Sequence, residues 1–501
     1  MSHVGAWPVR SYSRGALIFL LSAAAICAFF LAPIARIAAV ALLGGLFVLY
    51  LIATTLDGRI DVPLLFWVAI FPLGYYLSFL LREPLITLDR IVIVVLLMGM
   101  CLASGRKTIM LPKELRRSAV AWGCFLLVAL ASAEKAKDPL SSVRASFDGF
   151  ILPALLGWCI IRNFDVRRHL ITLHAMVCTM AVYVAALGAV EMRTGTDLLP
   201  LQDGGLYFAG SILRPNGPFS SINSFALIGL ISFFFLLFLR RTIGEQLPWW
   251  QRLLHTAGLA CALATALMPM FRSVGVTLLI ILLLDMYFNR RVGRMLAQIV
   301  VLTSVIGVLA AFSAKLPDAF EDRSHEGNFY SRIAQQRQTF ELFKMHPLTG
   351  LGIANFENVA EAQGQSVGFY KGFESGNSPH NNLGAILAET GLMGFLPYVA
   401  AQVLLIAAFS QLYTVERRHS RAVWISFLYV FLSYWVSGLS LTSGYYSDLN
   451  LWYMFVMMVI YKFAITESKN PCVERRPELP DYSTKSSEYF SIEAATRALR
   501  S

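Results

Sequence analysis

The sequence predicts an all-α, polytopic membrane protein with about 14 transmembrane helices. Of its 501 residues, 56% are hydrophobic and only 15% are charged, against the roughly 25% charged residues of soluble domains. Mean hydropathy is +0.60, and apolar runs long enough to cross a hydrocarbon core of about 30 Å recur along the chain. These runs do not alternate polar and apolar residues as a membrane β-barrel would, so the spans are predicted to be helices.

The first apolar run, 16–34, follows Arg10 and Arg14 and passes through Arg36 straight into a second run. This continuity favours an uncleaved anchor over a cleaved signal peptide. By the same length criterion, further spans are predicted at 37–55, 62–81, 88–104, 118–133, 148–161, 169–190, 221–239, 253–271, 273–288, 295–313, 383–412, 422–440 and 446–464.

These spans divide the chain into four regions. Residues 1–313 hold the first eleven predicted helices with short loops, and 314–382 form one large polar loop. Residues 383–464 hold the last three predicted helices, and 465–501 form a polar, proline-bearing tail that we expect to be disordered. Within the large loop, the stretch 331–345 has the patterning of an amphipathic helix.

Basic residues gather in alternate connections between the predicted spans. The positive-inside rule therefore places these connections and both termini in the cytoplasm and the 314–382 loop outside. The same distribution explains the formal net charge of +11, and no basic stripe interleaved with aromatic residues points to nucleic acid. The residues are Arg106, Lys107, Lys113, Arg116 and Arg117; Arg162, Arg167 and Arg168; Arg240, Arg241 and Arg252; Arg290, Arg291 and Arg294; and Arg417, Arg418 and Arg421.

The chain contains 7 cysteines, and none of them forms a Cys-x-x-Cys pair. Six of the seven lie within apolar runs. The sequence therefore predicts neither a disulfide framework nor a metal site.

Two outward connections carry arginines next to the predicted membrane surface. Arg214 begins a run rich in proline and glycine, which predicts a turn that holds its side chain at the surface. Arg272 lies at the outward hinge between two nearly continuous spans, with no basic cluster around it. An isolated arginine there is costly unless it is paired, so both are candidate anion ligands, with a snorkelling side chain as the alternative.

The large loop supplies two further arginines and one rival base. Arg332 and Arg337 are five residues apart, which at about 100° per residue puts them on different faces of the predicted helix. A solvated helix face is the simpler account of both. His346 could act as a base, but the Pro-Leu-Thr-Gly that follows it predicts a tight turn that positions the loop.

His380, followed by Asn381, lies where the loop re-enters the membrane. Pro379 is expected to start the helix and to leave His380 near its first turn. An imidazole has a reference pKa of about 6.5 and suits proton abstraction, whereas a satisfied structural histidine is the plainer alternative.

Glu389 follows nine residues after His380, about 13 Å along a helix, which is too far for direct pairing. A carboxylate inside an apolar run is expensive and is expected to have another partner. Gly391 and Gly394 are expected to allow close helix packing there.

Three motifs of this region resemble the O-antigen ligase / polysaccharide polymerase superfamily of polytopic bacterial membrane proteins. They are H-P-L-T-G-L-G-x-x-N-F from His346, H-N-N-L from His380 and E-T-G-L-M-G from Glu389. The similarity covers roughly residues 210–394 and resembles that family's large periplasmic loop with the helix that follows it.

The resemblance implies an inner-membrane glycosyltransferase. Its donor would be a polyprenyl-diphosphate-linked glycan, transferred with inversion and without metal or cofactor to lipid A–core or to another repeat unit. Arg214 and Arg272 resemble the family's two helix-boundary arginines for the diphosphate, and His380 resembles its histidine base. Arg272 stands in Phe-Arg-Ser, where the family often shows a Ser-Arg-Gly-like run.

Several functions stay open on the sequence. A single large loop with a terminal histidine favours a ligase, and an exopolysaccharide polymerase is the close alternative. A transporter of polysaccharide or lipid would need charges or broken helices at mid-membrane and internal pseudo-symmetry, and Arg90 is the basic residue found within a run. A non-catalytic scaffold is a further alternative.

Overall fold

The computed structural model describes the protein in segments, and these segments are almost entirely helical, which confirms the all-α fold class. The described residues are 49–50, 52–54, 61–74, 87–103, 111–196, 208–209, 212–243, 247–289, 326–363, 369–370, 373–374, 378–412, 418–441 and 446–469. The predicted runs 16–34 and 295–313 and most of the predicted tail lie outside them. The described residues therefore do not test the predicted number of fourteen spans.

The described part of the chain contains six helices that are long and apolar enough to cross a membrane. Each of them covers a predicted span. They are Lys113–Lys135, Pro139–Asn163, Val166–Thr194, Ile222–Ile243, Asn382–Gln411 and Ser447–Thr466.

Within the described residues, the elements are a series of helices with two short hairpins. The hairpins are antiparallel pairs of two-residue strands, β1–β2 and β3–β4. In chain order the elements are α3 (Asp61–Ile70), η1 (Phe71–Leu73), α4 (Leu88–Ala103), α5 (Lys113–Ser132), η2 (Ala133–Lys135), α6 (Pro139–Ser146), the π-helical turn η3 (Phe147–Ile151), α7 (Leu152–Asn163), α8 (Val166–Thr194), β1 (Phe208–Ala209), β2 (Ile212–Leu213), α9 (Ile222–Ile243), α10 (Trp249–Leu267), α11 (Arg272–Asn289), α14 (Glu326–Met345), α15 (Phe356–Gln363), β3 (Phe369–Tyr370), β4 (Phe373–Glu374), α16 (Asn382–Gln411), α17 (Arg418–Gly438) and α18 (Ser447–Lys469).

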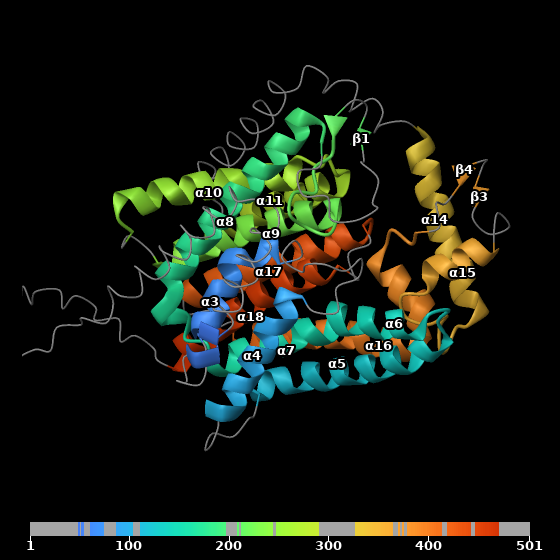
Figure 1. The fold of residues 1–501 in the computed structure, drawn as a ribbon, viewed down its shortest axis with the longest axis horizontal. Coiled ribbons are helices and arrows are strands. Elements are labelled where there is room, and N and C mark those ends of the chain that lie inside the picture. Colours follow the sequence, from blue (N-terminus) through green and yellow to red (C-terminus); the bar gives the residue numbers. More distant parts are fainter. Residues whose placement is uncertain are drawn as a thin grey trace, which may run out of the picture.

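The helices pack around α9 and α18, which are apolar on all sides and buried along most of their length, as expected for central helices. Helices α5 and α16 pair along one edge of the bundle, while α8 and α10 pair along the opposite edge (Figure 1). Helix α14 packs on α16. Arg90 of α4 is neutralised by Asp148 of η3, with 2.9 Å between Arg90 Nε and Asp148 Oδ1.

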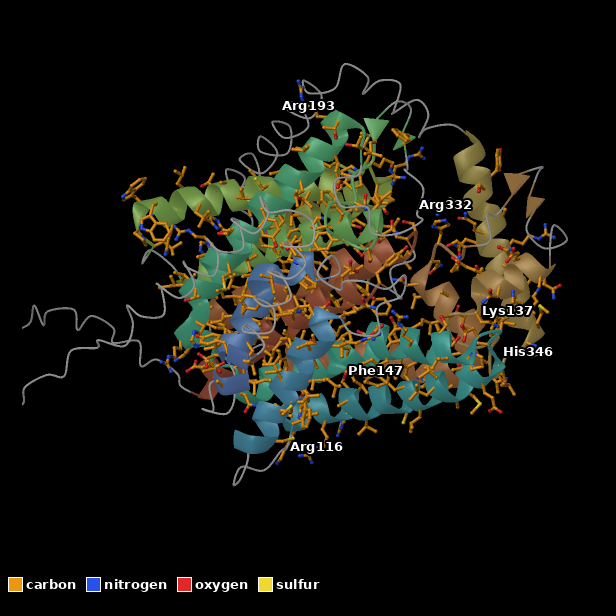
Figure 2. The ribbon with its side chains drawn as sticks, viewed as in Figure 1. Arg116, Lys137, Phe147, Arg193, Arg332 and His346 are labelled. Carbon is orange, nitrogen blue, oxygen red and sulfur yellow. The ribbon has the colours of Figure 1, made fainter. Side chains whose placement is uncertain are left out.

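The two ends of the bundle differ in charge. The basic residues Lys462, Arg421 and Arg241 contact the Ile161 carbonyl, the Phe288 carbonyl and the Asp285 carboxylate, so these helix ends gather on one side. Arg116 lies at this side, whereas Lys137 and His346 lie at the opposite one, next to α14 (Figure 2). Among the described residues, these basic residues and α14 with the turn after it thus lie at opposite ends of the bundle. Which end faces the cytoplasm stays a prediction of the sequence.

Helix α16 breaks at Gly391 (φ 60°, ψ −168°), and the turn after α14 fills the break. In an unbroken helix the amides of Leu392 and Met393 would donate to the carbonyls of Ala388 and Glu389. Here they donate instead to Pro347 (2.9 Å) and Leu348 (3.0 Å). The carbonyls of Ala388 and Glu389 accept from Leu351 (3.0 Å) and Gly352 (2.9 Å), so the hydrogen bonds lost by the helix are replaced by the turn.

The expectation that Gly391 and Gly394 serve helix packing is wrong. A Cβ on Gly391 would lie 2.4 Å from the Leu348 carbonyl carbon, and a Cβ on Gly394 would lie 2.4 Å from Thr390 of the same helix. Gly391 therefore admits the backbone of the turn, because a residue at this φ and ψ with a side chain would clash.

Candidate active site

Arg214 is buried at the hinge between α10 and α11. Its Nε donates to the carbonyl of Pro269 at 2.9 Å, and its guanidinium carbon lies 4.5 Å from the centre of the Phe271 ring. The side chain is therefore fixed both by a hydrogen bond and by a cation–π contact. This hinge leads directly into Arg272, so the two predicted arginines belong to one corner of the molecule.

Three helices hold the turn that carries Arg214. The amide of Gly217, which has a φ of 53°, donates to Glu191 Oε2 of α8 at 2.8 Å. Ser220 donates to Asp448 Oδ2 through its amide (3.0 Å) and its hydroxyl (2.9 Å). The Ser224 hydroxyl of α9 donates to Asp448 Oδ1 at 2.8 Å. Glu191 and Asp448 thus support Arg214, and the sequence argument missed both.

Arg272 is the first residue of α11, and its side chain is exposed. The amino end of a helix already carries a partial positive charge, so an arginine there is unfavourable by itself and becomes favourable when an anion binds. This placement fits an anion ligand better than it fits a residue kept for stability.

His380 precedes α16 and is not in its first turn. The helix begins at Asn382, because the Asn381 side chain caps it by accepting from the amides of Leu383 (3.0 Å) and Gly384 (3.2 Å). His380 has a φ of 40°, a left-handed conformation that is strained for a residue with a side chain. Its Nδ1 atom is buried and makes no hydrogen bond with the described part of the chain.

Burial lowers the pKa of His380 to about 4, and the positive charge of Arg332 acts in the same direction. The imidazole is therefore neutral at ordinary pH and can accept a proton. Arg332 donates to Gln335 Oε1 at 3.2 Å and lies on the side of α14 that faces the bundle (Figure 2). Arg337 is exposed on a different face, as the spacing predicts.

Tyr446 connects the loop with the start of α9. Its phenol forms hydrogen bonds with Ser221 and Asn223 and interacts electrostatically with the carboxylates of Asp448 and Glu357. Glu357 belongs to α15, so α15 lies within electrostatic reach of the ends of α9 and α18. Arg214 thus lies next to the hinge that leads into Arg272, and His380 lies within electrostatic reach of Arg332. The interaction of Glu357 with Tyr446 links the two regions.

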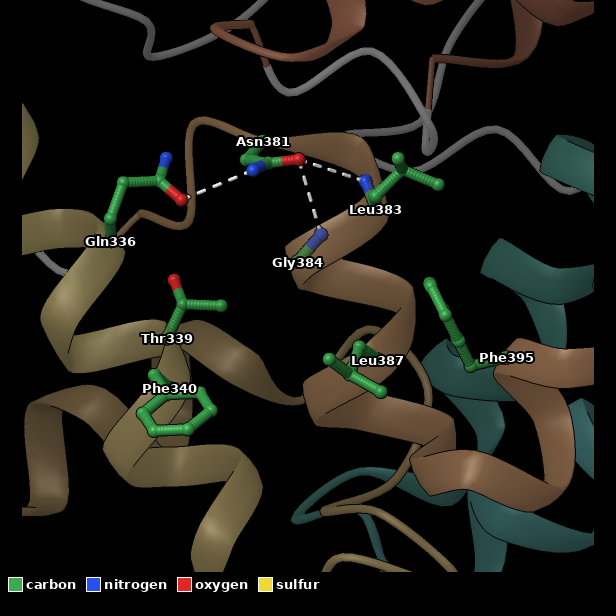
Figure 3. A pocket seen from close by; sticks show the side chains of 8 residues that line it. All are labelled: Gln336, Thr339, Phe340, Asn381, Leu383, Gly384, Leu387 and Phe395. Carbon is green, nitrogen blue, oxygen red and sulfur yellow. Dashed lines mark hydrogen bonds between the residues drawn. The ribbon is translucent and has the colours of Figure 1, made fainter. Parts of the chain in front are cut away.

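A groove of about 280 Å³ lies between α14 and the broken helix α16 (Figure 3). Its lining begins at Asn381, the residue that follows His380 in the chain. Asn381 stands at its polar end, where its Nδ2 donates to Gln336 Oε1 at 3.1 Å. The rest of the wall is mostly apolar. The lining residues are Gln336, Thr339, Phe340, Asn381, Leu383, Gly384, Leu387 and Phe395.

The two remaining candidates, His346 and Glu389, stabilise the structure of the loop. His346 is exposed at the end of α14, and its carbonyl accepts from the Gly350 amide at 2.9 Å, which forms the predicted turn. Glu389 is buried and accepts from the amides of Ala354 (2.9 Å) and Phe356 (3.0 Å), the latter being the first residue of α15. The partner that the sequence required for Glu389 is therefore the amino end of α15.

Residues 219–399 match the family model described as O-Antigen ligase. This segment is an O-antigen ligase family domain. It contains Arg272, Arg332 and His380 and begins five residues after Arg214. The match supports, in general terms, a multi-pass membrane protein that transfers glycans as a ligase or a polymerase does. No curated protein matches the chain.

Proposed function

We propose that the protein is a glycosyltransferase that moves a glycan from a polyprenyl-diphosphate carrier to lipid A–core at the periplasmic face of the inner membrane. The supporting observation is that the O-antigen ligase family domain contains both Arg272 and His380. Such a transfer needs a group that binds the diphosphate and a base that takes the acceptor proton. Arg214 and Arg272, which we call the arginine corner, suit the first task, and the neutral His380 suits the second.

The arginine corner would bind the diphosphate. A guanidinium stays charged and donates two parallel hydrogen bonds to phosphate oxygens, so it can hold the donor and stabilise the charge on the leaving diphosphate. Arg272 would supply this charge together with the amino end of α11, and Arg214 would be oriented by its contacts with Pro269 and Phe271.

His380 would act as the general base. An acceptor hydroxyl oxygen attacks the anomeric carbon, the bond from that carbon to the diphosphate oxygen breaks, and the hydroxyl proton passes to His380. A single displacement of this kind inverts the anomeric centre. The lowered pKa of His380 keeps it in its accepting form, and the approaching diphosphate would offset the charge of Arg332 and strengthen the base.

The test is the surface polysaccharide of cells that lack the protein and are complemented with variants. His380→Gln, Arg214→Gln and Arg272→Gln should each abolish transfer while the protein remains in the membrane. His346→Gln and Arg193→Gln are the matched controls, since both replace exposed residues away from these contacts.

The products separate the alternatives. Accumulation of full-length lipid-linked chains supports ligation to lipid A–core. Single lipid-linked repeat units would show a polymerase instead, and normal polysaccharide with all three variants would contradict the catalytic assignment.

A further inference from the structure

Helices α8 and α10 bring two histidines and a cysteine together inside the bundle. His174 Nε2 lies 3.1 Å from His255 Nδ1 and 3.7 Å from Cys178 Sγ. The three ligand atoms lie within 4.8 Å of one another, and all three residues are buried or nearly so. His174 and Cys178 are four residues apart on α8 and therefore share one face of the helix.

Hydrogen bonding alone accounts poorly for this cluster. His174 Nε2 faces both the His255 ring and the Cys178 thiol, yet one ring nitrogen carries either one hydrogen or one lone pair. The Nδ1 atom of His174 is buried and has no hydrogen-bond partner among the described residues, and a cation bound at Nε2 would not change this. A cation held between the three atoms would engage all of them at once.

The distances agree with metal coordination. For tetrahedral metal–nitrogen bonds of about 2.0–2.1 Å and metal–sulfur bonds of about 2.3 Å, neighbouring ligand atoms are about 3.3–3.6 Å apart. Two of the three separations, 3.1 Å and 3.7 Å, lie within 0.2 Å of that range, and all three ligand atoms lie within 4.8 Å of one another. Gly258 of α10 makes the close approach possible, because a Cβ there would lie 2.9 Å from the Cα and Cβ of Cys178.

We propose that His174, Cys178 and His255 bind one soft d10 cation, Cu⁺ in preference to Zn²⁺, between α8 and α10. Imidazole and thiolate are the ligands that suit both ions. Binding releases the thiol proton of Cys178 to solvent, so Cu⁺ with the thiolate forms a site without net charge. Zn²⁺ would leave one positive charge in the bundle, close to the positive charge of Arg240.

The cation would fix two of the helices that position Arg214, α8 and α10, relative to one another. Glu191, near the end of α8, accepts from the Gly217 amide of the turn, and Pro269, just after the end of α10, accepts from the Arg214 side chain. A metal between α8 and α10 would fix the spacing of these two anchors. Local sequence spacing does not reveal this site, because His255 lies 81 residues from His174.

The test is the metal content of the full-length protein, purified in detergent without a metal-affinity step and reloaded separately with Cu⁺ and Zn²⁺. About one Cu⁺ per chain should survive desalting, and a Cu⁺ chelator should lower the melting temperature. Cys178→Ala and His255→Gln should lose both effects. Cys159→Ala, which removes a buried thiol of α7, should keep both.

A second measurement uses the unaltered chain. Co²⁺ added to metal-free protein should give a thiolate-to-cobalt absorption band that Cu⁺ abolishes. Absence of this band, or equal metal binding by Cys178→Ala, overturns the site. A chain that retains Zn²⁺ and not Cu⁺ overturns the choice of ion, and metal held by Cys159→Ala but not by Cys178→Ala supports the site.

Discussion

At the scale of the residue, His380 combines strain with chemical readiness. Its φ of 40° favours glycine, yet the chain places an imidazole there, with a buried Nδ1 that has no hydrogen-bond partner among the residues that the structure describes. Strained backbone of this kind costs of order 1–3 kcal/mol and persists where the surroundings enforce it. Such a residue is better explained by chemistry than by stability.

This reasoning predicts opposite effects for activity and stability at His380. His380→Gly should abolish glycan transfer, because the base is lost, while thermal stability in detergent is kept or rises by up to about 1 kcal/mol. His380→Ala should abolish transfer without that gain. A large fall in the melting temperature of His380→Gly would mean that the imidazole is a structural group.

Arg332 should extend the pH range of the reaction to lower pH, in addition to the larger effect of burial on His380. The pKa of His380 is lowered by burial and by Arg332, so transfer should persist well below pH 6.5 and fail as the pH drops towards about 4. Arg332→Gln removes the charge, raises the pKa of His380 and should move the acid limb of kcat/KM to higher pH. Arg337→Gln is the matched control, and identical acid limbs in both variants would contradict the coupling.

At the scale of the element, α16 depends on Gly391. Gly391→Ala should destabilise the protein by about 1–3 kcal/mol, because its backbone conformation is nearly exclusive to glycine and the added Cβ meets Leu348. Thermal unfolding in detergent measures the effect. Gly123→Ala is the control, since a Cβ in the middle of α5 meets nothing within 4 Å and should be neutral or stabilising. Equal melting temperatures for the two variants would argue against the break.

At the scale of the whole molecule, the charge difference between the two ends predicts the orientation. A cysteine at His346 should react with a membrane-impermeant maleimide in cells with a permeabilised outer membrane, and a cysteine at Arg116 should react only after lysis. Both positions are exposed and lie at opposite ends (Figure 2). Labelling is compared with the parent protein, which has its own cysteines. Reaction of Arg116→Cys before lysis would invert the assignment.

The sequence predicted the six described spans well, because length and hydrophobicity decide membrane helices. It also predicted the helix at 331–345 and the turn after His346. It missed the break at Gly391, because a glycine inside an apolar run is equally compatible with an unbroken helix that packs closely on a neighbour. The supports of Arg214 were missed as well, because Glu191 and Asp448 reach it through tertiary contacts that no local pattern records.

The exchange of backbone partners at Gly391 has a mechanical consequence. Four hydrogen bonds join the turn to the two halves of α16, and each contributes roughly 0.5–1.5 kcal/mol. If the turn moved away, the backbone groups of α16 at the break would lose their hydrogen-bond partners. We therefore expect residues 347–352 and the two halves of α16 to move as one body. To admit a bulky sugar chain, either this body would move as a whole, or parts of the loop that are not hydrogen-bonded to it would move.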